Sequence, residues 1–245
     1  MKLVTLNAEG NRHLDRIIPF LEHERPEVIC LQEVFERDAF FIAEHLGMSC
    51  AFSVMALDTY ERRSEILEPI GIAILTDNEP DSIHIVHYKN GDAPVVSYTE
   101  GRDRHSLLWV EIEHEHELYV IGTTHLMVTN EGLPTHEQRT DVTNLLKILD
   151  NIPEIILCGD FNIPRGINEL YNQFATCYTD NIPKDIHTTL DPALHRAGDD
   201  PIGRAYITNF VVDYIFTTQT FCAENVRMVS GVSDHCALIA ELSNI

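Results

Sequence analysis

The chain is predicted to be a mixed α/β protein in which two mixed β-sheets pack face to face and helices cover both outer faces. Three observations predict this class: strand-like runs outnumber helical ones, a strand–helix–strand–helix order opens the chain, and the middle alternates short strands with turns as an antiparallel meander does. The same pattern is compatible with a three-layer α/β fold, in which helices flank one sheet.

The opening part of the chain alternates strands with helices. Apolar runs typical of buried strands cover residues 3–6 and 28–31. Residues 14–24 have apolar side chains at helical spacing, although Pro19 predicts a kink or a late start. Residues 35–46 repeat this spacing, and Gly47 suits the left-handed position that ends a helix.

The rest of the chain is dominated by short strands. Runs rich in β-branched residues predict strands over 50–57, 70–76, 82–88, 94–98, 106–113 and 118–125. Thr135–Gln138 matches a capping box and begins a helix. A strand over 154–158, a helix around 167–174 and strands over 210–217, 221–229 and 236–242 follow. The polar stretch 179–209 has little periodicity, and loops this long are usually functional or mobile.

Length and composition predict one domain over residues 1–245, because no repeat, linker or low-complexity segment interrupts the chain. No apolar run approaches the roughly 18 residues of a membrane helix, and the first ten residues are too polar for a signal peptide. We therefore expect a cytoplasmic protein without stable membrane association. Six widely spaced cysteines, with no Cys-x-x-Cys pair, predict buried free thiols. The pattern indicates no oligomeric state.

The formal net charge of −22 disfavours binding to an extended duplex, because such binding depends on neutralising phosphates with Lys and Arg. Thirteen of the seventeen basic residues are arginines, whose planar forks suit phosphate recognition. They include Arg62, Arg63, Arg102, Arg104, Arg139 and Arg165, several of which fall in predicted loops. A locally basic pocket on an acidic body favours a small or single-ended substrate.

The most informative motif is Gly159-Asp160-Phe161-Asn162, which follows the apolar run 154–158. A strand that ends in this motif brings Asp160 and Asn162 to one edge of a sheet. Because side chains alternate along a strand, both are predicted to point to the same face.

Further polar residues follow other predicted strands. Asn7 and Glu33 come after the first two strands, and Asp234 with His235 precedes the last one. Hard oxygen ligands gathered at one sheet edge indicate Mg²⁺ or Mn²⁺ rather than zinc. The sequence therefore predicts a metal-dependent hydrolase of phosphate esters.

Six motifs in order resemble the endonuclease/exonuclease/phosphatase superfamily over residues 4–242: Leu6-Asn7, Leu31-Gln32-Glu33-Val34, Thr124-His125-Leu126, Gly159-Asp160-Phe161-Asn162, Val212-Asp213-Tyr214-Ile215 and Ser233-Asp234-His235. This resemblance implies the four-layer form of the fold. It also implies a metal site formed by Asn7, Glu33 and Asp234. A carboxylate at the end of a buried strand, as Glu33 is predicted to be, is costly without a cation partner.

The catalytic roles combine this resemblance with physical argument. Asp160 is expected to accept a proton from the attacking water, and Asn162 to hold that water or a phosphate oxygen. His235 is expected to be an imidazolium oriented by Asp213, in contact with the scissile phosphate or acting as general acid–base. His125 resembles the phosphate-stabilising histidine of several branches of the superfamily.

The leading hypothesis is a Mg²⁺-dependent phosphodiesterase that uses in-line attack of an activated water, with a nucleic-acid end or a nucleotide as candidate substrate. Alternatives are a small phosphorylated metabolite and a lipid head group. A non-catalytic binding module is expected to have lost at least one site residue, and all are present. Glu9 stands where some abasic-site endonucleases place an Asp, and Tyr60 is a guess for the phosphate-contacting tyrosine of some nucleases.

Overall fold

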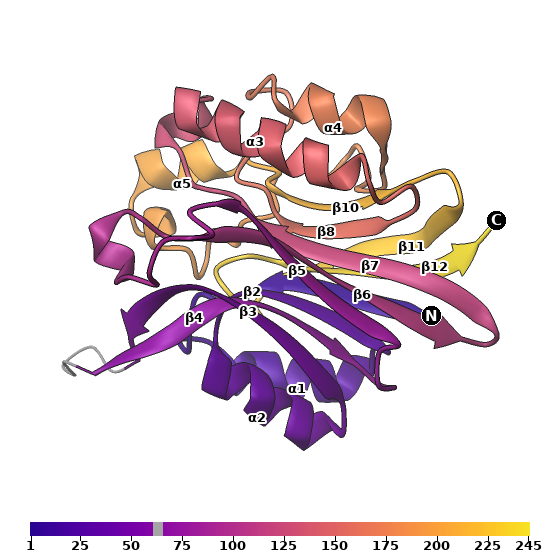
Figure 1. Cartoon of the computed structure of the whole chain (residues 1–245). Coiled ribbons are helices and arrows are strands. Elements are labelled where there is room, and N and C mark those ends of the chain that lie inside the picture. Colours follow the sequence, from indigo (N-terminus) through magenta and orange to yellow (C-terminus); the bar gives the residue numbers. More distant parts are fainter. Residues whose placement is uncertain (61–65) are drawn as a thin grey trace.

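The computed structural model describes residues 1–60 and 66–245, and within them two six-stranded sheets pack face to face (Figure 1). Sheet A contains β1 (Lys2–Asn7), β2 (Val28–Phe35), β3 (Ser49–Thr59), β4 (Leu67–Thr76), β11 (Phe221–Val229) and β12 (Ala237–Asn244). Sheet B contains β5 (Ser82–Lys89), β6 (His105–His114), β7 (Glu117–His125), β8 (Ile156–Asp160), β9 (Thr179–Asp180) and β10 (Asp213–Thr217).

Helices cover both outer faces. α1 (Leu14–Glu24) and α2 (Glu36–Leu46) lie on sheet A, whereas α3 (His136–Leu149) and α4 (Tyr171–Cys177) lie on sheet B (Figure 1). A fifth helix, α5 (Pro201–Ile207), and the short 3₁₀ helices η1 (Tyr98–Glu100), η2 (Asn130–Gly132) and η3 (Arg196–Asp199) lie in connecting segments. The predicted four-layer α/β sandwich is confirmed, and the three-layer alternative is wrong.

The sheet topology brings the ends of several strands together. The strand order is β11-β12-β1-β2-β4-β3 in sheet A and β5-β6-β7-β8-β10-β9 in sheet B. The parallel pairs β1/β2 and β7/β8 lie near the middle of the two sheets, and β10 runs antiparallel to β8. Asp160 is the register partner of both His125 and Asp213. Parallel strands end at the same sheet edge, so their terminal side chains are neighbours.

The largest apolar cluster fills the space between the sheets, where Val28 and Ile72 of sheet A face Leu108 and Ile156 of sheet B, and it continues beneath α3 and α4. A second cluster lies between sheet A and its helices and includes Ile17 of α1 and Ile42 of α2. Both are apolar positions of the predicted helical stripes, which explains why the helices pack where they do.

Helix α1 has the predicted bounds, because it begins at Leu14 and continues past the exposed Pro19 without a delayed start. Several other predicted boundaries are wrong. The strand predicted over 94–98 is instead an isolated bridge between Leu57 and Ser97 followed by η1, because Pro94 has no N–H to donate to a ladder. The strand predicted from residue 210 begins only at Asp213. The aperiodic 179–209 segment contains β9, η3 and α5.

Other local predictions hold. Gly47 ends α2 with φ of +71°. The Thr135 hydroxyl accepts a hydrogen bond from the Gln138 N–H at 3.1 Å, as a capping residue should. The reciprocal half of the capping box is missing, because the Gln138 side chain donates to the carbonyls of Met127 and Asn162.

The cysteines and the helices bear on two further expectations. All six cysteines lie in the described residues and are free: Cys30, Cys158 and Cys236 are buried, Cys50 and Cys222 half-buried, and Cys177 exposed. The prediction of buried thiols is therefore wrong for Cys177, which ends the surface helix α4.

Among the described helices, none combines the length and apolarity needed to cross a bilayer.

Substitution of Gly159 by Ala is predicted to destabilise the fold strongly. Gly159 has φ of +136°, and the Cβ of an alanine there would lie 2.1 Å from the Thr124 carbonyl oxygen on β7. The left-handed backbone and the overpacking together should lower the free energy of unfolding by about 3 kcal/mol, measured by urea denaturation.

The matched control is Gly166→Ala. Gly166 also has a positive φ, of +80°, but no atom lies within 4 Å of the corresponding Cβ. The Gly166→Ala substitution should lower the free energy of unfolding by only about 1 kcal/mol, because backbone strain is its only cost. Equal losses in the two variants would show that the close approach of β7 and β8 is unimportant.

Candidate active site

The floor of the candidate site is the place where the two sheets meet at their strand ends. Asn7, the last residue of β1, donates from its side-chain Nδ2 to Glu33 Oε1 at 3.2 Å and to Asp160 Oδ2 at 3.1 Å. One amide therefore links carboxylates of both sheets. The Asn7 Oδ1 atom accepts the Glu9 N–H at 3.1 Å, which fixes the orientation of the amide.

Glu33 reaches the site by a different route from the predicted one. Strand β2 does not end before Glu33 but continues to Phe35, with a register shift between Leu31 and Val34. Glu33 lies in this irregularity with φ of +48°, and its carbonyl accepts the Gly10 N–H at 2.7 Å. A β-bulge re-aims side chains next to active sites, and here it turns the Glu33 carboxylate toward Asn7.

Asn162 also differs from the prediction of two side chains alternating along a strand. It lies beyond the end of β8 with φ of +50°, so a turn rather than a strand places it beside Asp160. Its N–H donates to Asp160 Oδ1 at 2.9 Å. Its Nδ2 atom donates to the Leu126 carbonyl at 2.9 Å and lies 3.2 Å from His125 Nε2. Asn162 therefore lies beside Asp160 as predicted, but a turn of the backbone, rather than alternation along a strand, places it there.

Asp160, Asp213 and His235 form a buried charged group. His235 Nδ1 lies 2.8 Å from Asp213 Oδ2, and His235 Nε2 lies 3.8 Å from Asp160 Oδ2. Burial by itself lowers the pKa of His235, but the charges of Asp213 and Asp160 and the bond to Asp213 raise that pKa well above its usual value. Burial, followed by the charge of Asp213, raises the pKa of Asp160. The group therefore pairs an imidazolium with a carboxylate of increased basicity.

Thr189 and Asp191 hold this group in place, a role that the sequence did not assign to them. The Thr189 hydroxyl accepts the N–H groups of Val212 and Asp213, each at 3.1 Å. The Asp191 N–H donates to the Asp234 carbonyl at 2.7 Å. Both residues are buried, and both lie in the aperiodic 179–209 segment. Polar residues in so long a connection were the available signal.

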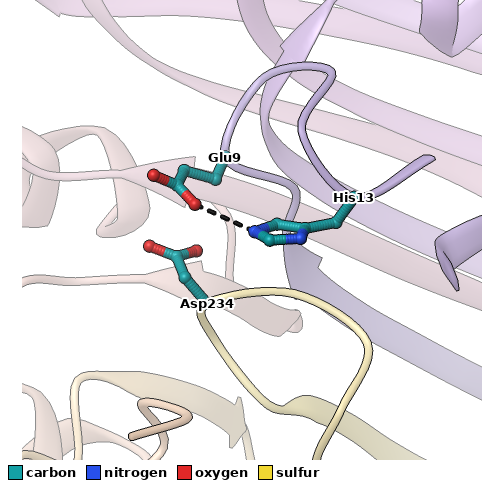
Figure 2. Close-up of side chains that lie close together, drawn as sticks. All are labelled: Glu9, His13 and Asp234. Atoms are coloured by element: carbon teal, nitrogen blue, oxygen red, sulfur yellow. Dashed lines mark hydrogen bonds and ion pairs between the residues drawn. The ribbon is translucent and has the colours of Figure 1, made fainter. Parts of the chain in front are cut away.

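A second group of metal-ligating side chains lies beside the first. Figure 2 shows the carboxylates of Glu9 and Asp234 facing each other, with the ring of His13 next to Glu9. One potential ligand atom from each of the three lies within 4.8 Å of the other two, and Glu9 Oε2 is 3.0 Å from His13 Nε2. The sequence analysis did not identify His13, whose only signal is its position four residues after Glu9.

This region fits a hard divalent cation. Burial raises the pKa of Asp234, and although the charge of His235 lowers it, the charges of Glu9 and Glu33 help to raise it to about 6. Among the described residues, no Lys or Arg nitrogen lies within 4.0 Å of the Asp234 or Glu33 carboxylates. Mutually repelling carboxylates without a basic partner form the type of oxygen-rich donor set that Mg²⁺ or Mn²⁺ binds.

His125 ends β7, and its Nε2 atom lies 3.5 Å from Asp160 Oδ2 and 3.7 Å from Glu33 Oε1. A buried polar group supports its backbone: His105 Nδ1 donates to the His125 carbonyl at 2.5 Å. On its other side, His105 contacts Asp103, whose carboxylate is also 3.9 Å from Lys89 Nζ. The position of His125 thus depends on ionised residues outside the site.

A cavity of about 650 Å³ lies over this floor. Six of the eight predicted site residues line it: Glu33, His125, Asp160, Asn162, Asp234 and His235. The other two, Asn7 and Asp213, lie behind the lining as hydrogen-bond partners.

Of the arginines suggested by the sequence, the four that the structure describes do not line the cavity. Arg104 and Arg165 donate to backbone carbonyls, and Arg102 and Arg139 pair with nearby glutamates. Arg62 and Arg63 lie outside the described residues. Arg12 and Arg196 line the cavity instead.

Tyr60, the guess for a phosphate-contacting tyrosine, lines the cavity with its ring, but its hydroxyl donates to Asp38 at 3.0 Å. Tyr98, which the sequence analysis did not single out, also lines the cavity. Burial raises the pKa of its hydroxyl, and the charges of Glu33 and Asp160 raise it further. Tyr98 thus shares the cavity lining with Glu33 and Asp160, and it is 43% exposed.

The matching family model is that of the Endonuclease/Exonuclease/phosphatase family, and it covers residues 4–235. The chain belongs to this family, so the resemblance drawn from its motifs is confirmed. The fold is that of a phosphoesterase and supports hydrolysis of phosphate esters. A search of curated proteins finds no match.

Solved structures share the fold at low sequence identity. An endonuclease/exonuclease/phosphatase from Beutenbergia cavernae has a TM-score of 0.77 and 18% identity, covering 100% of this chain and 71% of its own. The human Nocturnin catalytic domain with bound sulfate has a TM-score of 0.73 and 16% identity, covering 100% and 93%. D. rerio TDP2 complexed with single strand DNA product has a TM-score of 0.70 and 12% identity, covering 100% and 99%.

The buried group beneath His125 should make stability depend on acid pH. Burial raises the pKa of Asp103, but the hydrogen bond and charge of His105 and the charge of Lys89 outweigh it and lower this pKa to about 2. Because the folded pKa lies below the ordinary value, Asp103 stabilises the fold above about pH 4, and this contribution is lost as pH falls toward 2.

Replacing Asp103 by Asn should therefore lower the free energy of unfolding at pH 7 by about 1–2 kcal/mol, and by progressively less below about pH 4. Urea denaturation at several pH values measures the difference. Asp81→Asn, at an exposed carboxylate, is the control and should change little at any pH. A deficit in Asp103→Asn that stays constant down to pH 3 would contradict the assigned ion pair.

Proposed function

We propose that this chain is a Mg²⁺-dependent phosphodiesterase that hydrolyses phosphate esters by in-line attack of water. The observation that carries the proposal is the convergence of Asp160 and the Asp213–His235 pair with Glu33 and Asp234 on the floor of one cavity. Attack on a phosphate ester requires neutralisation of the anion, a proton acceptor for water and stabilisation of the leaving oxygen. The residues of this floor have chemistry suited to each requirement.

Glu33 and Asp234, with the side-chain oxygen of Asn7, are the residues that would hold the cation, and Glu9 is near enough to Asp234 to join them. When bound, Mg²⁺ would neutralise phosphate charge as a Lewis acid, and Mn²⁺ would serve the same role. The raised pKa of Asp234 supports this assignment, because burial and, after it, the charges of Glu9 and Glu33 disfavour the ionised carboxylate, and a bound cation would favour it.

Asp160 is proposed to take the proton from the attacking water. It is 1% exposed, and the Asn7 amide and the Asn162 N–H hold its two oxygens. A carboxylate with a raised pKa is a better base than an exposed one. Asn162 and His125, whose side chains are 3.2 Å apart, are proposed to position the phosphate oxygens or the water.

His235 is proposed to donate a proton or a hydrogen bond to the phosphoryl group. The bond from its Nδ1 atom to Asp213 orients the ring and leaves Nε2 on the cavity side. Its raised pKa keeps it charged at neutral pH, so it can neutralise charge that develops on the leaving oxygen.

The substrate is proposed to be a phosphodiester, with a nucleic-acid end and a small phosphate ester as the two candidate classes. The D. rerio TDP2 complex contains a single strand DNA product, and human Nocturnin contains a sulfate, a phosphate-like anion. A binding module without activity is disfavoured because no catalytic side chain is missing.

The first test removes the metal. Hydrolysis of bis-p-nitrophenyl phosphate should require Mg²⁺ or Mn²⁺ and stop on addition of excess EDTA. Mg²⁺ should also raise the melting temperature of the wild type, because a ligand that binds only the folded state stabilises it. Glu33→Gln should lose both effects. Full activity in EDTA would refute the metal dependence.

The second test removes the imidazolium. His235→Ala should lower kcat by about 10²-fold or more, because a positioned acid–base group contributes at least that much. His23→Ala, at an exposed histidine on α1, is the control and should retain wild-type activity. An unchanged kcat in a folded His235→Ala variant would refute the role assigned to His235.

A further inference from the structure

The cavity over the catalytic floor has the size and enclosure of a small-molecule site. Its volume of about 650 Å³ lies within the range typical of pockets that bind compact ligands. Two groups of aromatic and aliphatic side chains line it in addition to the polar floor. They come from different elements: one group lies on β2, β4, η1 and the residue after β3, and the other on α5 and the segments on either side of it.

The wall next to sheet A is formed by Phe35, Tyr60, Ile70 and Tyr98. The rings of Phe35 and Tyr60 meet edge to face with centroids 5.0 Å apart. Tyr60 is held further by the hydrogen bond of its hydroxyl to Asp38 and by the Arg37 guanidinium, 4.1 Å from the ring centroid. These contacts limit ring movement, so the wall is a preformed apolar surface.

The second wall, which we call the α5 wall, is formed by Leu190, Tyr206, Ile207 and Phe210. Three of these pack in a small apolar cluster of their own, and Tyr206 extends it, with its ring centroid 4.6 Å from that of Phe210. Tyr206 remains 43% exposed. Exposed aromatic area around a concave site is a mark of ligand binding rather than of folding.

The charges of the cavity disfavour a polymer. Its described lining has carboxylates at Glu9, Glu33, Asp58, Glu131, Asp160 and Asp234 but guanidinium groups only at Arg12 and Arg196. Arg12 is already paired with Glu9. Further phosphates of a nucleic acid would enter a described lining in which carboxylates outnumber the Arg contacts that polymer binding needs.

We propose that the substrate is a small phosphodiester whose two ester groups are compact and apolar or ring-bearing, one held by each wall. This inference rests on the proposed function, because it takes the floor between the walls as the phosphate site. A small diester fits better than an extended strand because the cavity offers two separate apolar walls for its two ester groups, while further phosphates would meet an acidic lining.

The test compares two esters with the same leaving group. Bis-p-nitrophenyl phosphate presents a ring to each wall, whereas methyl p-nitrophenyl phosphate leaves one wall unfilled. The wild type should prefer the first in kcat/KM by about tenfold or more, the scale of a filled apolar subsite. Tyr206→Ala should lower this preference at least threefold, mainly through KM, and Tyr206→Phe should restore it because the ring is what contacts the substrate.

Phe40→Ala is the matched control, since Phe40 is also an exposed aromatic residue, 49% accessible on α2, but does not line the cavity. Each variant is described by its kcat/KM for bis-p-nitrophenyl phosphate divided by its kcat/KM for methyl p-nitrophenyl phosphate. Comparing this ratio between variants removes the difference in intrinsic reactivity of the two esters. A preference that is unchanged in both Tyr206→Ala and Tyr60→Ala would overturn the proposal. So would inhibition by a ten-nucleotide single-stranded DNA at concentrations below the KM for bis-p-nitrophenyl phosphate.

Binding separates failure of this inference from failure of the proposed function. If the wild type hydrolyses neither ester with Mg²⁺, the proposed function fails, and calorimetry then tests the walls alone. The His235→Ala variant should bind bis-p-nitrophenyl phosphate at least threefold more tightly than the His235→Ala/Tyr206→Ala double variant. Equal affinity in the two would overturn the assignment of the walls.

Discussion

The hydrogen bond from the Asn7 amide to Asp160 joins the edges of the two sheets, and the arrangement of the site depends on it. The same nitrogen reaches Glu33, so one neutral side chain keeps two carboxylates at a defined separation. Strand β8, which ends at Asp160, is buried along its whole length and keeps this carboxylate from water, whereas the Glu33 side chain is 31% exposed and faces the cavity. Asn suits the position because it donates to two acceptors without adding charge.

Several charged side chains are buried where the two sheets meet, at a cost in desolvation. This cost is expected at a site that binds or stabilises charged groups. Asp160, Asp213 and His235 are each less than 10% exposed, and the imidazolium between the two carboxylates compensates part of their desolvation. Glu9, Glu33 and Asp234 have no comparable basic partner among the described residues apart from histidines and the exposed Arg12. This imbalance is the physical reason for assigning the cation to that side of the floor.

The backbone that delivers these groups is less regular than their spacing in sequence suggests. Glu33 and Asn162 both have positive φ and owe their directions to a bulge and a turn. The N–H groups of Val212 and Asp213 donate to the Thr189 hydroxyl instead of to a neighbouring strand. Strained or irregular backbone concentrates at functional sites because regular elements offer only a few side-chain directions. It is also the feature that periodicity cannot reveal.

The sequence by itself determined the α/β class, the majority of the strands and helices, and the set of polar residues that surround the floor. It could do so because hydrophobic periodicity and strand-end motifs are local properties. Only the tertiary structure decided which arginines are free of structural bonds, that His13 lies beside Asp234, and that Tyr98 and Tyr206 line one cavity. These relations join residues far apart in the chain or set by loop geometry, and no local pattern encodes which of them pack together.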